Sequence, residues 1–582
     1  MTNAEISRAL ERLATLLEID GANVFRVRAH REAARIVESH AEPMARFAAE
    51  AGALEEIKGI GKDLAQKIRD LASTGDTAML TELRSRIPDE VAGFTELQGL
   101  GPKRVKTLFE ELGIRDRTQL EAAAKAGRLR GLPGFGEKVE QNVIKSLATA
   151  SQWSGRMLLA GAWPLAHALA ERVRALKGVA QVELAGSFRR RKETVGDLDL
   201  LVTGGDAESV MRAFTTHESV VDVLGRGETK SSVRLQNGLQ VDLRVVPAES
   251  YGAALLYFTG SKEHNIELRR IAQDKGLSLN EYGLTRGEET VAARTEEEVY
   301  RALGMAWIPP ELREARGEIE RAIAGDLPKL IELRDLHGDL HMHSTRSDGR
   351  DDLDTMAQAA LDRGYAYIAI TEHSKALAMA NGFDAARVRQ SVHEIEALRG
   401  RFPGLRILHG LEVDILKDGS LDLDDATLAI LDWVIISIHS HFEMTPEDAT
   451  ARALKAVRNP WVHVFGHPRG RVIGSREGSP FDIEAVAAEA AAHGVAMELN
   501  ASPDRLDLSD VNARLAREKG CRFTIDTDAH ATHHLDNMRF GVFQARRAGL
   551  TKADVLNTLS PAAFEKVLPR PRTKRRSKRQ AS

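Results

Sequence analysis

The sequence predicts a multidomain protein with a helical N-terminal region, a mixed α+β middle region and a C-terminal α/β barrel. Three observations support this fold class. Glycine turns followed by amphipathic helices repeat near the N-terminus, two aspartates lead into an apolar strand in the middle, and histidines recur at the ends of strands that alternate with helices towards the C-terminus. A chain of 582 residues is long enough to form several such domains.

The composition is that of a globular protein without a membrane segment. Hydrophobic residues make up 43% of the chain, and no apolar run approaches the roughly 20 residues that cross a bilayer. The polar N-terminus is unlike a secretory signal, and the single Cys521 excludes an intramolecular disulfide, so we expect a cytoplasmic protein. The net charge of −4 by itself argues against a nucleic-acid binder. It is only an average, however, and the electrostatic field of a protein depends on how its charges are distributed.

Three similar units follow one another in the N-terminal region, at residues 57–68, 97–108 and 132–144. Each contains Gly-apolar-Gly before an amphipathic helical pattern, and the glycines are Gly59, Gly61, Gly99, Gly101, Gly134 and Gly136. Basic residues lie nearby: Lys62, Lys103, Arg104 and Lys138. Glycine permits a sharp turn, and free N–H groups at the start of a helix favour an anion. A single Gly-x-Gly is usually only a turn, but three resemble the helix-hairpin-helix motif and predict a clamp on DNA phosphates.

The middle region is organised around residues 185–202, AGSFRRRKETVGDLDLLV. Asp197 and Asp199 lead into an apolar run that indicates a buried strand, and alternation along a strand places both carboxylates on one face. Asp242 is the one acid in a second alternating strand, residues 239–246, and we expect it beside them. Crowded carboxylates need a cation, and such ligands suit Mg²⁺ or Mn²⁺ shared with a substrate phosphate. An ordinary surface turn is the alternative.

The stretch GSFRRRKETVGDLDLLV resembles the palm signature of the nucleotidyltransferase superfamily, and more narrowly that of the family X DNA polymerases, the relatives of polymerase beta. YFTGS at 257–261 and NEY at 280–282 match further motifs in the same order. The resemblance implies that Asp197, Asp199 and Asp242 are catalytic and hold two ions. It also implies a set of substrate-binding residues: Gly186, Ser187, Arg190, Tyr257, Phe258, Gly260, Asn265 and Arg269.

Three basic side chains keep two interpretations each. Lys67 matches the polymerase beta lysine that forms a Schiff base with an abasic sugar, and a solvated helix lysine is the alternative. Asp63 and His30 depart from the family pattern, which has lysine and tyrosine at these positions. Arg189 is either a further phosphate ligand or a surface arginine. Arg244 either orients the carboxylates or forms a structural salt bridge.

The C-terminal part carries histidines and acids at the ends of successive predicted strands. His341 and His343 alternate along one strand, so both face the same way. The other members follow later in the chain: Asp348, His373, Glu412, His439, His467, Asp528 and His530. Alternation of strands with helices indicates a parallel α/β barrel, whose chemistry lies at the carboxyl ends of its strands. One histidine there would more often be structural, but six histidines and three acids predict a metal site.

This cluster resembles that of the polymerase and histidinol phosphatase (PHP) domain, a phosphoesterase barrel with three metal ions. The resemblance implies one ion held by His341, His343, Glu412 and Asp528, a second that Glu412 bridges and His439 and His467 complete, and a third held by Asp348, His373 and His530. Mixed imidazole and carboxylate ligands suit Mn²⁺, Zn²⁺ or Fe²⁺. Glu372 departs from the family pattern, which usually has aspartate. His441, Asp414 and Arg469 are candidates for phosphate binding or for support of the ligands.

Together these patterns predict seven segments. They are a helix-hairpin-helix, lyase-like DNA-binding domain at 1–88, a second helix-hairpin-helix subdomain at 89–150, a nucleotidyltransferase palm at 151–260, a thumb-like subdomain at 261–315, a linker at 316–336, a PHP phosphoesterase domain at 337–568 and a basic tail at 569–582. We expect the linker to be a solvated spacer helix. The tail either adds nonspecific DNA affinity or only increases solubility.

The resemblances imply a bacterial-type family X DNA polymerase fused to a PHP nuclease domain. The expected substrates are gapped or nicked DNA and deoxynucleoside triphosphates. The expected activities are gap filling in base-excision repair and 3′–5′ exonuclease trimming of 3′ ends, with abasic-site lyase or endonuclease activity as a further option. We expect a monomer associated with the nucleoid and not with a membrane. The alternatives are a DNA-binding repair scaffold with inert sites and a PHP phosphatase with an inactive polymerase core.

Overall fold

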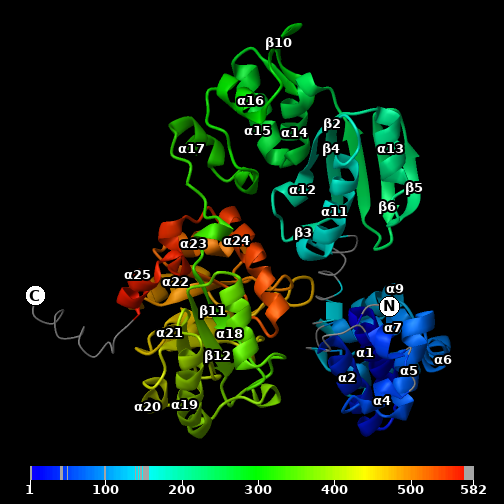
Figure 1. Cartoon of the computed structure of the whole chain (residues 1–582), viewed down its shortest axis with the longest axis vertical. Coiled ribbons are helices and arrows are strands. Elements are labelled where there is room, and N and C mark those ends of the chain that lie inside the picture. Colours follow the sequence, from blue (N-terminus) through cyan, green and yellow to red (C-terminus); the bar gives the residue numbers. More distant parts are fainter. Residues whose placement is uncertain are drawn as a thin grey trace, which may run out of the picture. The chain divides into compact units, whose positions relative to one another are not determined.

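The computed structural model describes residues 3–39, 44–48, 50, 52–97, 100–137, 139–141, 143–144, 147 and 156–568. The chain divides into two compact units, of which the first holds residues 1–154 and the second almost all the rest (Figure 1). Of the predicted features, Gly99, Lys138 and the basic tail at 569–582 lie outside the described residues.

The first unit is helical. Its helices are α1 (Asn3–Asp20), α2 (Val24–Ser39), α3 (Met44–Ala48), α4 (Ala53–Glu56), α5 (Lys62–Thr74), α6 (Ala78–Arg86), α7 (Asp89–Gly93), η1 (Phe94–Glu96), α8 (Pro102–Leu112) and α9 (Arg117–Lys125). Helix α1 is apolar along two stretches and joins two cores. Ile6 and Leu10 pack with α2 and α5, whereas Leu13 and Leu17 pack with α6 and α8. Burial of these side chains is the main stabilisation of such short helices.

Two of the predicted glycine turns lead directly into helices. Gly61 is the residue before α5 and Gly101 the residue before α8, which begins with Pro102 in the first turn, where proline is tolerated. Gly59 and Gly134 have φ of 96° and 79°, a conformation that other residues rarely adopt. The two helices therefore start where the sequence predicts them to start.

The second unit begins with a five-stranded sheet in the order β2-β4-β7-β6-β5. The strands are β2 (Val179–Leu184), β4 (Asp197–Gly204), β5 (Val220–Arg226), β6 (Lys230–Leu235) and β7 (Gln240–Val245). Strands β4 and β7 are parallel, and the other pairs are antiparallel. Helices α11 (Leu159–Arg174) and α13 (Ala207–Thr215) share a core with the sheet. Since Leu198 and Leu200 belong to that core, alternation turns Asp197 and Asp199 to the opposite face.

The next segment is mainly helical and carries a small antiparallel sheet. Its elements are α14 (Tyr251–Thr259), α15 (Lys262–Asp274), β8 (Ser278–Asn280), β9 (Gly283–Arg286), β10 (Glu289–Ala292), α16 (Glu296–Ala302) and α17 (Glu318–Ala324). Helix α17 lies in the expected linker, but Ile319 and Ala322 belong to the core of this segment. Glu318 is buried, 2.7 Å from Nδ1 of His264. The interpretation of this stretch as a solvated spacer is therefore wrong for α17, because its apolar face is covered.

The C-terminal part is a parallel barrel whose seven strands follow in sequence order. They are β11 (Gly338–Met342), β12 (Tyr367–His373), β13 (Arg406–Asp414), β14 (Trp433–Ser437), β15 (Val464–Phe465), β16 (Ala496–Asn500) and β17 (Phe523–Asp526). The first and last strands meet at a bridge between Met342 and Ala529, and the backbone N–H of Leu340 donates to the Asp526 carboxylate at 2.8 Å. The barrel is thus nearly closed, and the α/β fold class is confirmed.

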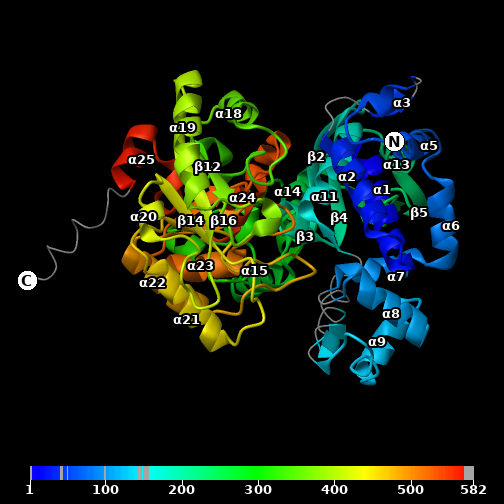
Figure 2. The same cartoon turned by 90° about the horizontal axis from the view of Figure 1, so that it is seen from below.

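Helices surround the barrel strands, as Figures 1 and 2 show. They are α18 (Leu353–Asp362), α19 (Ala385–Arg401), α20 (Asp425–Leu428), α21 (Pro446–Val457), α22 (Ile483–His493), α23 (Asp510–Glu518), α24 (Met538–Arg547) and α25 (Pro561–Val567). Most start at a side chain that caps the free backbone N–H groups, such as Asp352 before α18 and Asp482 before α22. This arrangement leaves the carboxyl ends of the strands for a site.

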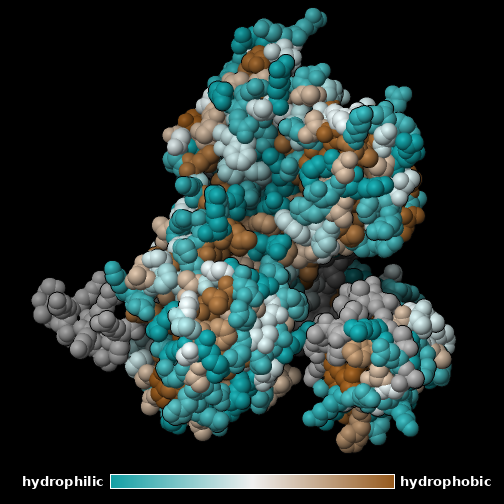
Figure 3. Space-filling view, viewed as in Figure 1, coloured by the Kyte–Doolittle hydropathy of each residue, from teal (hydrophilic) through white to brown (hydrophobic). Residues whose placement is uncertain are grey.

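Within the described part of the chain, no helix is both long and apolar enough to cross a membrane. The face drawn in Figure 3 is mostly hydrophilic, with apolar side chains scattered over it.

Candidate functional site

Three carboxylates meet on the open face of the five-stranded sheet. In the parallel register of β4 and β7, Asp199 lies directly opposite Asp242, and Asp197 precedes Asp199 by two residues. Burial, and then repulsion from Asp197 and Asp242, raises the pKa of Asp199 to about 7. The ammonium of Lys230 lies 3.2 Å from Asp242. A divalent cation would offset the repulsion among these three carboxylates and favour the ionised form of Asp199, so the cluster is a candidate cation site.

Gly186 lies against this cluster. Its φ is 61°, and a Cβ built there would be 2.7 Å from Oδ2 of Asp199. No side chain fits at such a distance without a shift of the carboxylate. The short helix α12 (Gly186–Arg189) that follows carries Ser187 and ends beside Arg190. The predicted Gly-Ser turn therefore directly adjoins the predicted metal-binding carboxylates.

The other residues of the predicted substrate set lie around helix α14 and its end. The guanidinium of Arg190 donates to the carbonyl of Thr259, and a Cβ on Gly260 would lie 3.0 Å from Nη1 of Arg190. The Tyr257 and Phe258 rings pack edge to face with centroids 5.1 Å apart. Asn265 donates to the carbonyl of Tyr257 at 2.7 Å, and Arg269 donates to the carbonyl of Asn265 at 3.2 Å. The set is thus continuous in space.

The two arginines with open interpretations have distinct surroundings. Arg189 is largely buried and forms two hydrogen bonds to Glu296, of 2.8 and 2.9 Å, so it is not a surface arginine. Glu296 also accepts from Arg313, which is completely buried. Arg244 lies 4.6 Å from the centroid of the Phe258 ring and has no carboxylate bonded to it among the residues that the structure describes, while its charge opposes the raised pKa of Asp199. Arg244 therefore acts on the carboxylates electrostatically.

Lys67 in the N-terminal unit is only 5% exposed, so it is not the solvated helix lysine of the alternative interpretation. Its Nζ lies 2.5 Å from Oδ2 of Asp63, one helical turn earlier on α5. His30 is also buried, its Nε2 has no hydrogen-bond partner in the described part of the chain, and burial lowers its pKa. His30 thus differs from Arg26 and Arg28 on the same helix, both of which are exposed.

The nine predicted barrel residues converge at the carboxyl ends of the strands. Three groups have ligand atoms within 4.8 Å of one another: His343, Asp348, His373 and His530; His341, His343 and Asp528; and His373, Glu412 and His439. His467 joins them through Nε2, which lies 2.9 Å from Oε1 of Glu412. Glu412 is completely buried among histidines on several sides, as a bridging ligand would be.

The polar atoms of this cluster fit metal ions. Several atoms of the cluster are buried without a hydrogen-bond partner among the described residues, including Nε2 of His341, both ring nitrogens of His343, both oxygens of Glu412 and Oδ1 of Asp528. Such groups are costly to bury unless something completes them. Burial and the neighbouring His530 and His373 lower the pKa of His343 to about 3, so its ring is neutral, as a ligand must be. Imidazole and carboxylate donors in this arrangement favour transition-metal ions.

Further side chains hold the cluster in place, and two of them, Glu498 and Asn500, were not predicted. Glu498 on β16 lies 2.6 Å from Nδ1 of His341 and accepts from the backbone N–H of His467. Asp414, a predicted candidate for this role, lies 3.1 Å from Nδ1 of His439. Asn500 donates to Asp528 at 3.2 Å. The signal for Glu498 was an acid followed two residues later by Asn500 in an otherwise apolar strand.

Two other candidates serve the barrel wall. Glu372 accepts hydrogen bonds from the hydroxyls of Ser344 and Ser347 and so supports the loop after β11. Arg469 donates to the carbonyl of Phe481 at 2.8 Å and lies 5.2 Å from the centroid of its ring.

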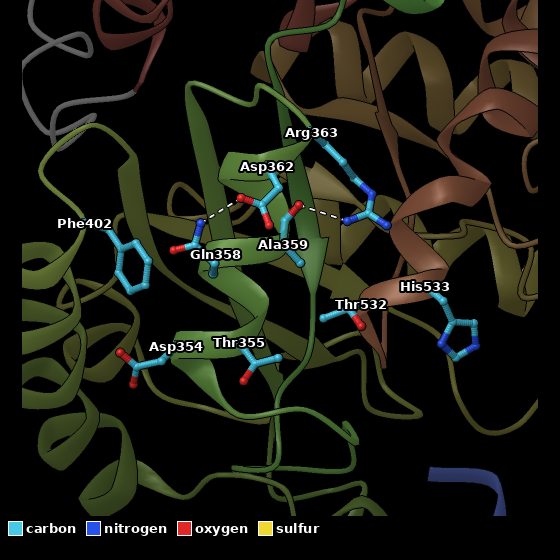
Figure 4. Close-up of a pocket in the computed structure, with 9 residues that line it drawn as sticks. All are labelled: Asp354, Thr355, Gln358, Ala359, Asp362, Arg363, Phe402, Thr532 and His533. Atoms are coloured by element: carbon cyan, nitrogen blue, oxygen red, sulfur yellow. Dashed lines mark hydrogen bonds between the residues drawn. The ribbon is translucent and has the colours of Figure 1, made fainter. Parts of the chain in front are cut away.

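A polar depression of about 620 Å³ lies on the outside of the barrel, beside α18 (Figure 4). Asp354, Asp362 and Arg363 line it with Phe402 and His533. Its lining includes none of the predicted site residues, and Figure 4 shows Gln358 and Arg363 engaged in hydrogen bonds within α18 and its end. It is therefore separate from the metal cluster.

Comparison with protein families matches five segments of the chain. They are "Helix-hairpin-helix domain" at residues 1–77, "SAM-like Helix-hairpin-helix tandem" at 92–149, "DNA polymerase beta palm" at 162–271, "DNA polymerase beta thumb" at 254–314 and "PHP domain" at 339–500.

Three similar proteins cover different parts of the chain. "DNA polymerase/3′-5′ exonuclease PolX" of Bacillus subtilis is 38% identical over 574 residues, which are 98% of this chain and 100% of that protein. A "Probable phosphatase" of Syntrophotalea carbinolica is 30% identical over 230 residues, 38% of this chain and 90% of that protein. "DNA polymerase lambda" of Rattus norvegicus is 24% identical over 342 residues, 54% of this chain and 56% of that protein.

Proposed function

We propose a DNA-repair function for this chain, which belongs to the family of the bacterial DNA polymerase/3′–5′ exonuclease PolX. As a member of that family it extends DNA primers with deoxynucleotides and hydrolyses 3′ ends. Its task in our proposal is to fill short gaps left by base-excision repair and to trim the ends that cannot be extended. The observation that carries the proposal is the presence of two separate clusters of side chains suited to bind cations, one of carboxylates on β4 and β7 and one of histidines and carboxylates in the barrel.

In the polymerase reaction, Asp197, Asp199 and Asp242 would hold two Mg²⁺ or Mn²⁺ ions. Bound there, such ions activate the primer 3′-hydroxyl and stabilise the triphosphate and the leaving pyrophosphate. Gly186 leaves room for the Asp199 carboxylate to remain in place.

Side chains beside the carboxylates would bind and orient the nucleotide. Ser187 and Arg190 are proposed to bind its triphosphate, because a hydroxyl and a guanidinium are suitable donors to phosphate oxygens. Tyr257 and Phe258 would pack against the sugar, and Asn265 and Arg269 would contact the nascent base pair. The mutual contacts of these residues support one continuous nucleotide site.

In the hydrolytic reaction, the nine barrel residues would hold three divalent ions, with Mn²⁺, Zn²⁺ or Fe²⁺ suited to the donor set. Such ions supply a hydroxide nucleophile near neutral pH and stabilise the charge on the phosphate oxygens. Glu498 and Asp414 keep the rings of His341 and His439 in the tautomer and orientation that present Nε2 to an ion. The proposed substrate is the 3′ end of a DNA strand, as in the 3′–5′ exonuclease family to which the chain belongs, and the helical unit is the proposed clamp for that DNA.

The glycine turns before α5 and α8 are proposed to bind DNA phosphates through backbone N–H groups. Such contacts carry no sequence information, so affinity should fall steeply with salt and vary little with sequence.

A lyase reaction is a second candidate function, supported by the burial of Lys67 beside His30. The amine of Lys67 would attack the aldehyde of an abasic sugar and form an imine with loss of water, which requires the neutral amine. The carboxylate of Asp63 lies 2.5 Å from this amine and would have to release it before the attack. Borohydride should trap the wild-type adduct, Lys67→Ala should remove it, and Asp63→Asn should increase it. An undiminished adduct in Lys67→Ala would assign the reaction to another amine.

Gapped DNA with a 5′-labelled primer separates the proposal from its rivals. With nucleotides and Mn²⁺, the primer should be extended to fill the gap, and without nucleotides it should shorten from its 3′ end. A scaffold with inert sites would give neither product. A phosphatase with an inactive polymerase core would release phosphate from small esters and leave the primer length unchanged.

A further inference from the structure

Helix α24 of the barrel ends against the turn of the sheet that carries Arg190. Nη1 of Arg547, the last residue of α24, donates to the backbone carbonyl of Arg190 at 2.7 Å and to Oε1 of Glu314 at 3.0 Å. Its Nη2 donates to Asp510 at 2.7 Å. The Arg547 side chain is 2% exposed, so these hydrogen bonds form in a nearly dry environment, where they are strong.

Arg190 and Arg547 share one acceptor. Nε of Arg190 donates to the same Oε1 of Glu314 at 3.1 Å, while Nη1 of Arg190 donates to the carbonyl of Thr259. Arg547 therefore fixes the backbone of Arg190. It also balances part of the negative charge of Glu314, the carboxylate that holds the Arg190 side chain. Without Arg547, Glu314 would be left with Arg190 as its strong partner and would compete with a phosphate for it.

The next residue of the turn is held by the same helix. Arg191 has a φ of 55°, and its guanidinium carbon lies 4.9 Å from the centroid of the Trp163 ring and 4.7 Å from that of Phe543. Phe543 precedes Arg547 by one turn of α24. Phe540, one turn further towards the start of the helix, belongs to the core of the five-stranded sheet. The turn thus has partners on α24 at both Arg190 and Arg191.

We propose that α24 completes the nucleotide site, with Arg547 and Phe543 as positioning residues that hold Arg190 ready for the triphosphate. The inference rests on the proposed function of Arg190. A long arginine side chain loses rotamer freedom when it binds phosphate, and a side chain already held in place loses less. The barrel would therefore support polymerisation through nucleotide binding, apart from its own hydrolytic chemistry.

The experiment is single-nucleotide insertion on gapped DNA by the full-length protein, with KM for the nucleotide and kcat measured separately. Arg547→Met should raise KM about tenfold and change kcat less than threefold, because the contact acts on ground-state binding of the triphosphate. Arg547→Lys, which keeps the charge but not the planar fork, should recover part of the affinity. Phe543→Leu, which keeps an apolar contact, should raise KM about threefold.

Arg546→Met is the matched control. Arg546 is the preceding residue on α24 and donates to Glu311 at 2.8 Å and to the carbonyl of Ile331, but not to Arg190 or Glu314. Its KM should equal that of the wild type, and a KM raised as far as in Arg547→Met would mean that any loosening of the helix has this effect and would overturn the proposal. Melting temperatures identify variants that fail to fold. If Arg547→Met is one of them, the KM values of Phe543→Leu and Arg547→Lys decide whether α24 positions Arg190.

Arg190→Gln separates the positioning role of α24 from the assignment of Arg190 to the triphosphate, on which that role rests. If Arg190→Gln leaves KM unchanged, the assignment of Arg190 to the triphosphate is wrong. If Arg190→Gln raises KM while folded Arg547→Lys and Phe543→Leu match the wild type, the nucleotide site stands and the positioning role of α24 is wrong.

Discussion

The carboxylate cluster of the sheet and the histidine cluster of the barrel are both suited to bind cations, but they differ in the type and the burial of their ligands. The sheet places three acids on two adjacent strands, and Asp197 is exposed. The barrel draws nine residues from many strand ends, and Glu412, His341 and His343 are completely buried. An open set of oxygen ligands suits an ion that arrives with a triphosphate, whereas an enclosed set with imidazoles holds ions by itself.

The two clusters also differ in how much surrounding structure they need. In the sheet, Gly186 contributes only the lack of a side chain. In the barrel, Glu498 and Asp414 hold Nδ1 of His341 and His439, which leaves Nε2 of both rings directed at Glu412. The barrel ligands are therefore held by further side chains, as a site proposed to bind ions without a substrate would require.

The largest expected effect is a crossover between the two activities. Asp199→Ala should lower nucleotide addition by about 10³-fold or more and spare 3′ hydrolysis, because charge stabilisation by metal ions contributes several kcal/mol. His343→Ala should do the reverse. Asp222→Asn and His393→Ala, at exposed positions in the same two regions, are the controls. Loss of both activities in one folded variant would show that the clusters are not independent.

A smaller loss is expected from Gly186→Ala. The new methyl group would push against Oδ2 of Asp199, so polymerisation should fall about 10²-fold while 3′ hydrolysis is unchanged. Gly238→Ala is the matched control, since Gly238 has a φ of 83° but no atom within 4 Å of its ideal Cβ. Equal losses in both variants would point to backbone strain rather than to contact with the carboxylate.

The support of the barrel site is tested by Glu498→Gln. This change keeps the shape but removes the charge that faces His341, so binding of Mn²⁺ to the barrel and 3′ hydrolysis should weaken about 10- to 100-fold. Polymerisation should not change. Titration calorimetry with Mn²⁺ measures the affinity, and Glu489→Gln on the outer helix α22 is the control. Unaltered affinity in Glu498→Gln would mean that the histidines are positioned without it.

The smallest effect concerns pH. The pKa of Asp199 is raised from 3.8 to about 7, so the folded metal-free protein binds more protons than the unfolded chain between these values, and its stability falls as pH rises through that range. Against the effect of burial, Glu412 and Asp348 raise the pKa of His373 in the barrel from 6.5 to about 10, so its contribution to stability is constant below about pH 6.5 and is lost between that pH and about 10. In EDTA, the melting temperature of the wild type should fall by about 2 °C more than that of Asp199→Asn between pH 5 and 7. Identical slopes would contradict the assigned pKa.

The sequence alone determined the parts of this protein that depend on short spacings. Two-residue alternation was enough to place Asp197 with Asp199 and His341 with His343, because the period of a strand is fixed by its backbone. Gly-apolar-Gly before an amphipathic pattern likewise predicted the starts of α5 and α8. Alternation of strands with helices predicted the barrel, and the recurrence of histidines at the strand ends predicted a metal site there.

Only the tertiary structure decided which distant residues meet. Glu498 reaches His341 across 157 residues, Arg189 reaches Glu296 across 107, and Arg547 reaches Arg190 across 357. The burial of α17 could not be predicted either, because its partners are distant in the sequence and its charged pattern resembles that of a solvated helix. Local periodicity fixes the face on which a side chain lies, but its partner depends on how the strands and helices pack, and that packing is a property of the whole chain.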